Sequence, residues 1–206
     1  MPKLTAIRRQ ALDEMMKEAL YEAAIAVLGE HGADGLTMDR VASAAGVAKG
    51  SLYRYFGSKR DLVEFVYTKM VDPIVRAEEQ IVAAEGPAME KLARQLRMLL
   101  EHVAKHAYVY RLLFEDEVTH GLLQTSEQRT LDTASRRLAE IFRQGMSEGV
   151  FHPADPCMLG HMYLGLIRGA LQSQPELGRR DQREEVQSAI LDAFLNGIAV
   201  KRGRID

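Results

Sequence analysis

The fold of this chain is decided by residues 36–62, which read LTMDRVASAAGVAKGSLYRYFGSKRDL. Thr37 occupies the position of a helix N-cap, because its hydroxyl can accept a hydrogen bond from the first turn of the helix that follows. Gly46 then predicts a tight turn, since glycine adopts a positive φ at no steric cost. A second short helix is expected at about 48–56. Two short helices joined by such a turn form a helix-turn-helix unit, here at about residues 37–56.

The second helix of such a unit enters the major groove of DNA, and its N-terminal residues face the edges of the bases. The groove-facing residues here are small apart from one lysine, and they are Lys49, Gly50 and Ser51. The lysine can donate to guanine or to a phosphate, and both assignments stay open. Phosphate contacts need charges, hydroxyls or a helix N-terminus. The residues that offer these groups are Thr37, Tyr53, Arg54, Tyr55 and Lys59.

The charge of the chain is unevenly distributed. Its 27 Lys and Arg against 29 Asp and Glu give a formal net charge of -2, which by itself argues against a nucleic-acid partner. Residues 1–60, however, hold nine basic and seven acidic residues, and from Gly46 to Arg60 four basic residues stand without an acid. The positive charge is therefore concentrated at the predicted reading helix, as binding to phosphates requires.

The flanking sequence also follows a helical period. Before the motif, apolar residues recur at spacings of three and four from Leu12 to Val27. After it, Ser58 to Asp61 has the form of a capping box that opens a longer helix. Further helices are expected from Pro87 to 103, over 108–114, from a break at Gly121 to Gly149, over 157–171 and over 182–200. No alternating segment typical of a strand is found, so we expect an all-α fold of about nine helices.

The composition is that of an ordinary globular protein. With 47% hydrophobic and 27% charged residues, the 206-residue chain can bury a sizeable core, which excludes a disordered, collagen-like or disulfide-stapled protein. Its single cysteine, Cys157, cannot form an internal disulfide, as is usual in a reducing cytosol. No apolar run reaches the length of a membrane span, and residues 1–10 lack the apolar segment of a signal peptide. We therefore expect a cytoplasmic protein without a membrane segment.

The titratable residues give little support to an enzyme or a metal site. His102 and His106 lie one helical turn apart and could share a metal ion. A third ligand would come from Glu115, Asp116 or His120. No cysteine cluster or second carboxylate and histidine pair at matched spacing accompanies them. The adjacent acids Asp116 and Glu117 do not face each other on a helix, as a catalytic pair would. We therefore expect no enzymatic activity, no cofactor and no metal.

The C-terminal two thirds contain methionine and aromatic residues, which form adaptable apolar walls around ligands. Candidates to line such a cavity are Met98, His102, Tyr108, Tyr110, Arg111, Phe114, Met158, His161 and Met162. Plain core packing explains any one of them equally well. If Arg111 reaches a cavity, the ligand would carry negative charge or a polar head.

The last two predicted helices carry more apolar surface than one core requires. Gly165 and Gly169 lie one turn apart and would allow another helix to approach closely. Apolar residues occupy two sides of the terminal helix, which favours a partner helix outside the monomer core. We expect a two-fold dimer through Leu166, Gly169, Ala170, Leu191, Phe194, Leu195 and Ile198.

In the spacing of its glycine, aromatic pair, serine cap and lysine, the stretch 36–62 resembles the DNA-binding domain of the TetR family of bacterial transcriptional regulators. The resemblance covers roughly residues 10–65, and the remaining two thirds match only in being helical. It implies a three-helix DNA-binding domain at residues 1–60 and an effector-binding and dimerisation domain at 61–206. We expect the functional boundary inside the helix that begins at Ser58, near Met70 to Pro73. It also implies a homodimer that binds a palindromic double-stranded DNA operator, usually as a repressor, until a small-molecule effector of unknown identity releases it.

The resemblance also assigns roles by position. It implies phosphate contacts at Thr37, Tyr53, Tyr55 and Lys59, and groove contacts at Lys49, Gly50 and Ser51. Tyr55 stands where many members have histidine, and both side chains can donate to a phosphate. An alternative from another class is a helical ligand- or metal-binding protein whose N-terminal unit mediates protein contacts. Salt dependence separates the two, because affinity for DNA falls steeply as salt rises.

Overall fold

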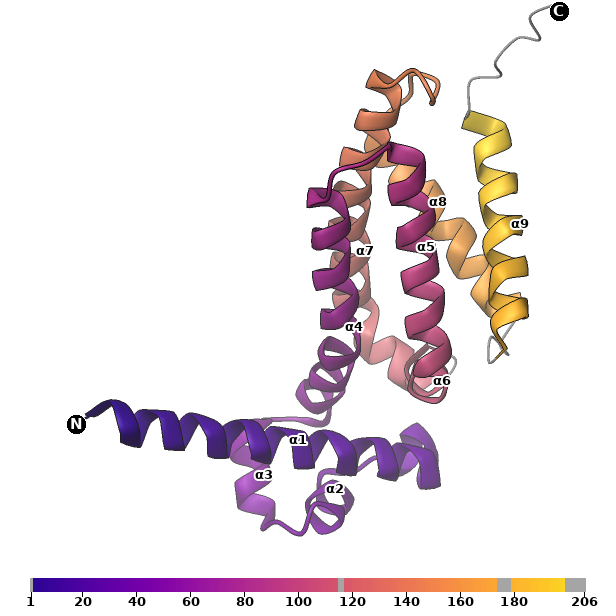
Figure 1. Cartoon of the computed structure of the whole chain (residues 1–206). Coiled ribbons are helices and arrows are strands. Elements are labelled where there is room, and N and C mark those ends of the chain that lie inside the picture. The colour runs from indigo at the N-terminus through magenta and orange to yellow at the C-terminus, as the bar shows by residue number, and fades with distance from the viewer. Residues whose placement is uncertain (1, 115–116, 174–178, 199–206) are drawn as a thin grey trace, which may run out of the picture. The chain divides into compact units, whose positions relative to one another are not determined.

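A computed structural model describes residues 2–114, 117–173 and 179–198 (Figure 1). Within these residues every regular element is a helix, which confirms the predicted all-α class. The nine described helices are α1 (Pro2–Gly35), α2 (Met38–Ala44), α3 (Lys49–Tyr55), α4 (Lys59–Ala83), α5 (Ala88–Lys105), α6 (Ala107–Phe114), α7 (Glu117–Ser147), α8 (Pro156–Ser173) and α9 (Arg180–Ile198). None of these described helices combines the length and the apolar character that crossing a membrane needs.

The chain divides into two compact units. Unit 1 consists of Met1–Met70 and Tyr108–Gln124, and unit 2 consists of Val71–Ala107 and Thr125–Asp206. The division falls inside α4, which continues as one helix through Pro73. The predicted DNA-binding domain ends at residue 60, with the functional boundary expected near Met70 to Pro73, whereas unit 1 also takes in the first part of α4, most of α6 and the start of α7.

The first three helices pack around a small apolar core in unit 1 (Figure 1). α2 contacts both α1 and α3. The most deeply buried side chains of these helices and of the residue after α1 have relative exposures of 1% or less, and they include Leu20, Ala24, Leu28, Leu36, Val41 and Leu52. Leu52 is the buried residue of α3, so the other side chains of this short helix stay at or near the surface.

The turn between α2 and α3 has the predicted form. Gly46 adopts a φ of 67°, in the left-handed region that favours glycine. The N–H of Val47 donates to the carbonyl oxygen of Ala42 at 2.9 Å, which closes the turn. Thr37 is the N-cap of α2, where its Oγ1 accepts from the N–H of Arg40 at 3.3 Å. The predicted helix-turn-helix is therefore confirmed.

One other glycine differs from its predicted role. α1 ends at Gly35 after departing from helical geometry at Gly32, with φ 64° and ψ -175°. The sequence predicts a break at Gly121, yet α7 runs through this residue. A glycine inside a helix costs only about 0.5–1 kcal/mol relative to alanine, so favourable flanking residues outweigh it.

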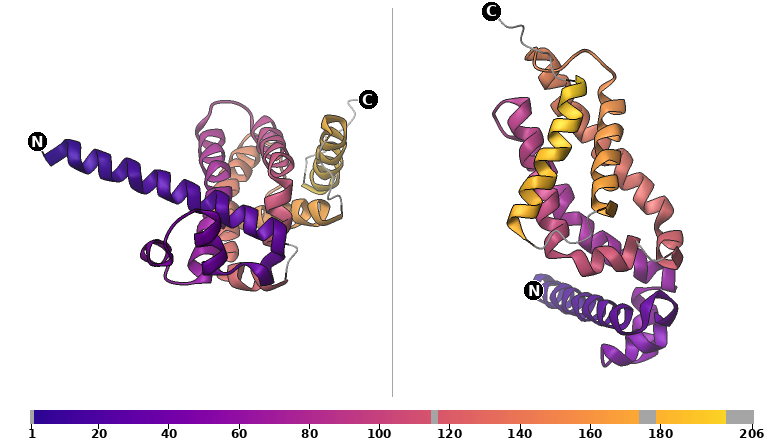
Figure 2. Two further views of the ribbon diagram at one scale, coloured as in Figure 1. Left: turned by 90° about the horizontal axis from the view of Figure 1, so that it is seen from below. Right: turned by 90° about the vertical axis from the view of Figure 1, so that its right-hand side faces the viewer.

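An aromatic cluster forms part of the core of unit 2. Phe142 of α7, Tyr163 of α8 and Phe194 of α9 are buried, and their ring centroids lie 5.0–6.2 Å apart. α9 lies beside α5 and α8 (Figure 2). The sequence predicts Phe194 at a dimer interface, and the structure corrects this, because its side chain packs inside its own subunit with 7% exposure.

We predict that Gly160→Ala lowers the free energy of unfolding by about 1–3 kcal/mol, because added core volume forces packed helices apart. Gly160 of α8 lies so close to α7 that a Cβ atom there would be 2.6 Å from the carbonyl oxygen of Ser135. The matched control is Gly121→Ala, where an added Cβ atom meets nothing within 4 Å. This control should stabilise the protein by roughly 0.5–1 kcal/mol. Urea unfolding measures both, and equal stability of the two variants would contradict the close contact.

Candidate nucleic-acid interface

The N-terminal end of α3 is presented to solvent. Lys49 and Gly50 are exposed, and Ser51 is half-buried. Ala48 is the N-cap residue and offers no side-chain hydrogen bond to the helix. A Cβ atom on Gly50 would meet nothing within 4 Å, so the surface here is open to close approach by another molecule. These are the residues that the sequence predicts to face the bases.

Lys49 is held at this surface by two neighbours. Its Nζ lies 2.6 Å from Oδ1 of Asp39, in the first turn of α2. The same Nζ lies 5.9 Å from the ring centroid of Tyr53, a side chain with 44% exposure. The hydrogen bond to Asp39 raises the pKa of Lys49, so the lysine carries its full charge at physiological pH. Sequence reasoning missed Asp39 because the acid lies on the preceding helix, outside the acid-free stretch.

Two predicted phosphate ligands contact α1 instead. The hydroxyl of Tyr55 donates to Oδ1 of Asp13 at 2.8 Å, and this bond raises the pKa of Tyr55. Nζ of Lys59 donates to the carbonyl oxygen of Ala33 at 2.6 Å. Both side chains are half-buried and tie the end of α3 and the start of α4 to α1. To contact a phosphate, each would have to exchange its protein partner for an oxygen of DNA.

The other predicted phosphate ligands are exposed. The guanidinium of Arg54 lies 5.6 Å from the ring centroid of Tyr55. Thr37 caps α2 near Asp39, and the ion pair of Asp39 with Lys49 brings this helix end beside the N-terminal end of α3. We call the exposed predicted residues the reading surface, which consists of Thr37, Lys49, Gly50, Tyr53 and Arg54.

The residues predicted to line a ligand cavity are spread over both units. The half-buried ones are Met98, His102, Tyr110 and Phe114, and the exposed ones are Tyr108, Arg111, Met158, His161 and Met162. Met158 and Met162 have exposures of 52% and 55%, so they do not line an interior cavity, which corrects the prediction for these two. Arg111 is exposed as well, so the structure gives no reason to place a ligand head group on it.

Two pockets inside unit 2 have different linings. A pocket of about 380 Å³ between α8 and α9 is lined by Leu166, Ala170, Gln182, Glu185, Val186, Ala189 and Ile190. A more polar pocket of about 330 Å³ between α5 and α9 is lined by Arg97, Leu100, Glu101, Arg180, Arg183, Glu184 and Gln187. Neither pocket is lined by a residue that the sequence predicts for a cavity.

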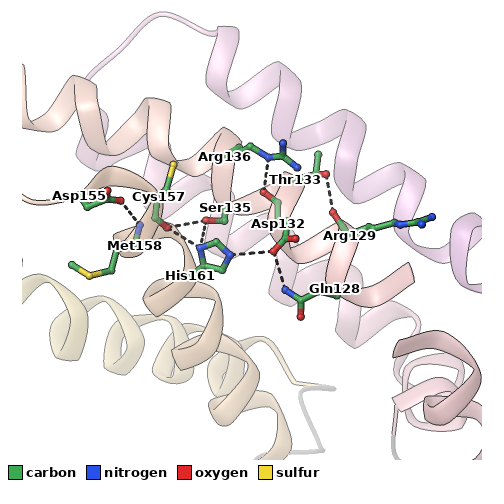
Figure 3. A network of polar contacts seen from close by, with 10 residues as sticks. All are labelled: Gln128, Arg129, Asp132, Thr133, Ser135, Arg136, Asp155, Cys157, Met158 and His161. Carbon is green, nitrogen blue, oxygen red and sulfur yellow. Dashed lines mark hydrogen bonds and ion pairs between the residues drawn. The ribbon is translucent and has the colours of Figure 1, made fainter. Parts of the chain in front are cut away.

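His161 joins α8 to α7 through a polar network (Figure 3). Its Nδ1 lies 2.8 Å from Oγ of Ser135 and 3.0 Å from the carbonyl oxygen of Cys157. Its Nε2 lies 3.3 Å from Oδ1 of Asp132. Only an imidazolium donates from both nitrogens, and the hydrogen bonds to Cys157 and Asp132 accordingly raise the pKa of His161. Ser135 is fully buried, so this serine, histidine and aspartate do not form an accessible catalytic triad.

The predicted metal ligands are brought together only in part. The rings of His102 and His106 have centroids 4.6 Å apart. Glu115 and Asp116 lie outside the described residues, and His120 belongs to unit 1 rather than unit 2. Over the described ranges of the chain, no group of three or more histidine, cysteine, aspartate or glutamate side chains could hold a metal ion.

One face of α8 carries exposed apolar and small residues. We call it the α8 stripe, and it consists of Met158, Met162, Gly165 and Gly169, at the helical spacings of four, three and four. Beside the stripe, Leu166 and Ala170 line the pocket that α8 shares with α9. The other residues predicted for a dimer interface are Leu191 and Leu195, which are half-buried, and Ile198, whose side chain lies outside the described part.

Comparison with known proteins agrees with this geometry. Residues 20–66 match the family described as bacterial regulatory proteins, tetR family. The chain is 28% identical over 144 residues to the HTH-type transcriptional repressor SCO4008 of Streptomyces coelicolor, an alignment that covers 69% of this chain and 71% of that protein. Two solved structures are similar at 18% identity and a TM-score of 0.75. One is the SmeT–triclosan complex, where the match covers 92% of this chain and 93% of that chain. The other is NalD, the secondary repressor of the MexAB-OprM multidrug efflux pump in Pseudomonas aeruginosa, where the match covers 92% of this chain and 98% of that chain.

The His161 network predicts that stability depends on pH. The pKa of His161 in the folded state is raised above the ordinary value of 6.5. The stabilisation is therefore fully present below pH 6.5 and is lost as the pH rises through the folded-state pKa. In His161→Gln this pH-dependent loss of stability should be absent. Urea unfolding at several pH values across the neutral range measures the free energy of unfolding of both proteins. NMR titration of the His161 ring gives the folded-state pKa directly, and a value at or below 6.5 would contradict the network.

Proposed function

Because the chain belongs to the TetR family of bacterial transcriptional regulators, we propose that it is a homodimeric repressor of a palindromic DNA operator. A small-molecule effector that binds unit 2 releases the dimer from the operator. The protein acts in the cytoplasm, where bacterial DNA lies. The observation that carries this proposal is the exposed N-terminal end of α3, where Lys49, Gly50 and Tyr53 lie on a stretch without acids.

The size of α3 suits the major groove. An α-helix with its side chains is about 10–12 Å in diameter, and the groove is about 12 Å wide, so a short helix such as α3 can enter it. Gly50 lets the DNA come close, while Lys49 donates to a base edge or a phosphate. Because Asp39 holds Lys49 in the free protein, a productive site has to replace this ion pair with an equally good acceptor.

The α8 stripe provides the proposed dimer interface. Two-fold dimers of helix-turn-helix proteins place their reading helices about 34 Å apart, one turn of DNA. Met158 and Met162 are large apolar side chains that are mostly exposed in the single chain. Gly165 and Gly169 carry no side chain, so the backbone of a second copy can approach closely there. A dimer through this stripe covers apolar surface that a single chain leaves in water.

The effector is proposed to act through α4. This helix is continuous from Lys59, at the end of the helix-turn-helix, into unit 2. Ligand binding in unit 2 that shifts α4 changes the spacing of the two reading helices, and a coupling of about 1–3 kcal/mol between the sites suffices for release. Support comes from the similar SmeT structure, which is a complex with the small molecule triclosan.

We predict that Met158→Asp combined with Met162→Asp converts the protein to a monomer, because each substitution buries a charge in the proposed interface. Each methionine contributes about 1.5–3 kcal/mol of apolar burial when fully covered, so the dimer constant should weaken at least tenfold. The control is Met89→Asp on α5, at a methionine with 38% exposure outside the stripe. Sedimentation at micromolar protein concentration measures the mass. A double variant that remains dimeric would contradict this interface.

We predict that Lys49→Ala weakens binding to DNA and lowers the slope of log affinity against log salt by about one, if the lysine contacts a phosphate. If Lys49 contacts a guanine instead, loss of this contact should weaken binding by about 1–3 kcal/mol and relax specificity at that base position. The side chain is 58% exposed, so the variant should fold normally. Fluorescence anisotropy measures both effects on fragments selected from genomic DNA by the wild-type protein.

The control for DNA binding is Lys105→Ala, which removes an exposed lysine of unit 2 and should leave the salt dependence unchanged. Failure of the wild-type protein to retain any genomic fragment would overturn the proposed function. That outcome would favour a helical ligand-binding protein whose N-terminal helices contact another protein.

A further inference from the structure

One polar residue interrupts the buried apolar face of α5. The buried positions of this helix are Ala88, Leu92, Gln95, Leu96, Leu100 and Val103. Gln95 has 1% exposure, so its amide is removed from water beside aliphatic neighbours. A buried amide destabilises a fold unless its hydrogen bonds are completed. The stability of unit 2 therefore does not explain why glutamine occupies this position.

The amide of Gln95 is only partly satisfied within the protein. Its Nε2 donates to Oε1 of Glu78 at 3.1 Å, and this carboxyl group of α4 has 4% exposure. The Oε1 atom of Gln95 is buried and has no hydrogen-bond partner within the described part of the chain. An acceptor without a donor therefore lies between α4 and α5.

Arg137 of α7 contributes a donor without an acceptor to the surroundings of Glu78. One of its nitrogens, Nη2, donates to Oε1 of Glu79 at 2.6 Å. The other, Nη1, is buried and likewise lacks a partner among the residues described. The charge of Arg137 acts on Glu78, but the pKa of Glu78 is raised because burial outweighs this charge and the hydrogen bond from Gln95. We call Glu78, Gln95 and Arg137 the buried polar cluster, and all three belong to unit 2.

We propose that the buried polar cluster binds the hydroxyl group of a neutral, mainly apolar small molecule. A hydroxyl can donate to Oε1 of Gln95 and accept from Nη1 of Arg137, so it completes both groups. An ammonium group has no lone pair to offer Arg137. A carboxylate has no hydrogen to offer Gln95 and would stand beside the carboxyl group of Glu78. The flanking residues of α5 are aliphatic, which suits an apolar body on the ligand.

This inference rests on the proposed function only in giving the ligand the role of the effector. Binding of the ligand itself can be measured without DNA. The informative variant is Gln95→Leu, which replaces the amide with an aliphatic side chain. The change removes the unpaired acceptor and also the hydrogen bond that Nε2 donates to buried Glu78, so thermal unfolding serves only to show that the variant folds. The same change should abolish recognition of the hydroxyl. If glutamine served only the fold, its replacement would leave ligand selectivity unchanged.

The probes are β-naphthol and naphthalene, which share one apolar body and differ by a single hydroxyl. We expect wild-type protein to bind β-naphthol at least about tenfold more tightly than naphthalene, and Gln95→Leu to bind the two equally. Isothermal calorimetry on the full chain measures all four affinities. The control is Gln80→Leu, at an exposed glutamine of α4, which should keep the wild-type preference.

Equal binding of both probes by the wild-type protein, or binding of neither, would overturn the proposal. Preference for the hydroxyl that survives in Gln95→Leu would also overturn it, because the hydroxyl would then lie elsewhere. If hydroxyl-selective binding is found but no DNA is retained, the inferred site stands and the proposed function fails. If DNA is retained and released by other compounds only, the proposed function stands and this site fails.

Discussion

The reading surface depends on the burial of Leu52. A helix of seven residues is not stable alone in water, so α3 keeps its shape and direction only by packing on the rest of unit 1. Leu52 is fully buried and Phe56, just after the helix, is 6% exposed. Covering two such side chains contributes about 3–6 kcal/mol, which exceeds the effect of any single surface contact of α3. The exposed residues of α3 are therefore held in place without being needed for folding.

The charged groups around this core have two separate roles. Tyr55 and Lys59 hold α3 and α4 against α1, whereas Lys49 lies at the surface with Asp39 as its partner. The formal net charge of -2 averages over a chain whose basic residues are concentrated from Gly46 to Arg60. Lys49 can bind DNA without an excess of positive charge on the whole molecule, because its ammonium group can exchange Asp39 for an acceptor on the DNA.

The local features of the fold were predictable because they depend on neighbouring residues. Thr37, Gly46 and Ser58 define caps and turns whose partners lie within a few positions. The contacts of Tyr55 with Asp13 and the burial of Phe194 were not predictable, because they join segments far apart in the sequence. The methionines of α8 show the same limit. Helical spacing places them on one face but does not tell whether that face points into the subunit or into water.

The proposed function requires that α3 contacts DNA with its N-terminal end. Hydrogen exchange of the full chain, with and without a fragment that it selects from genomic DNA, measures this contact. Peptides that cover residues 37–59 should exchange more slowly on the DNA than in the free protein, while the backbone of α5 should change little. Unchanged exchange over 37–59, with slower exchange confined to unit 2, would contradict a DNA contact by α3.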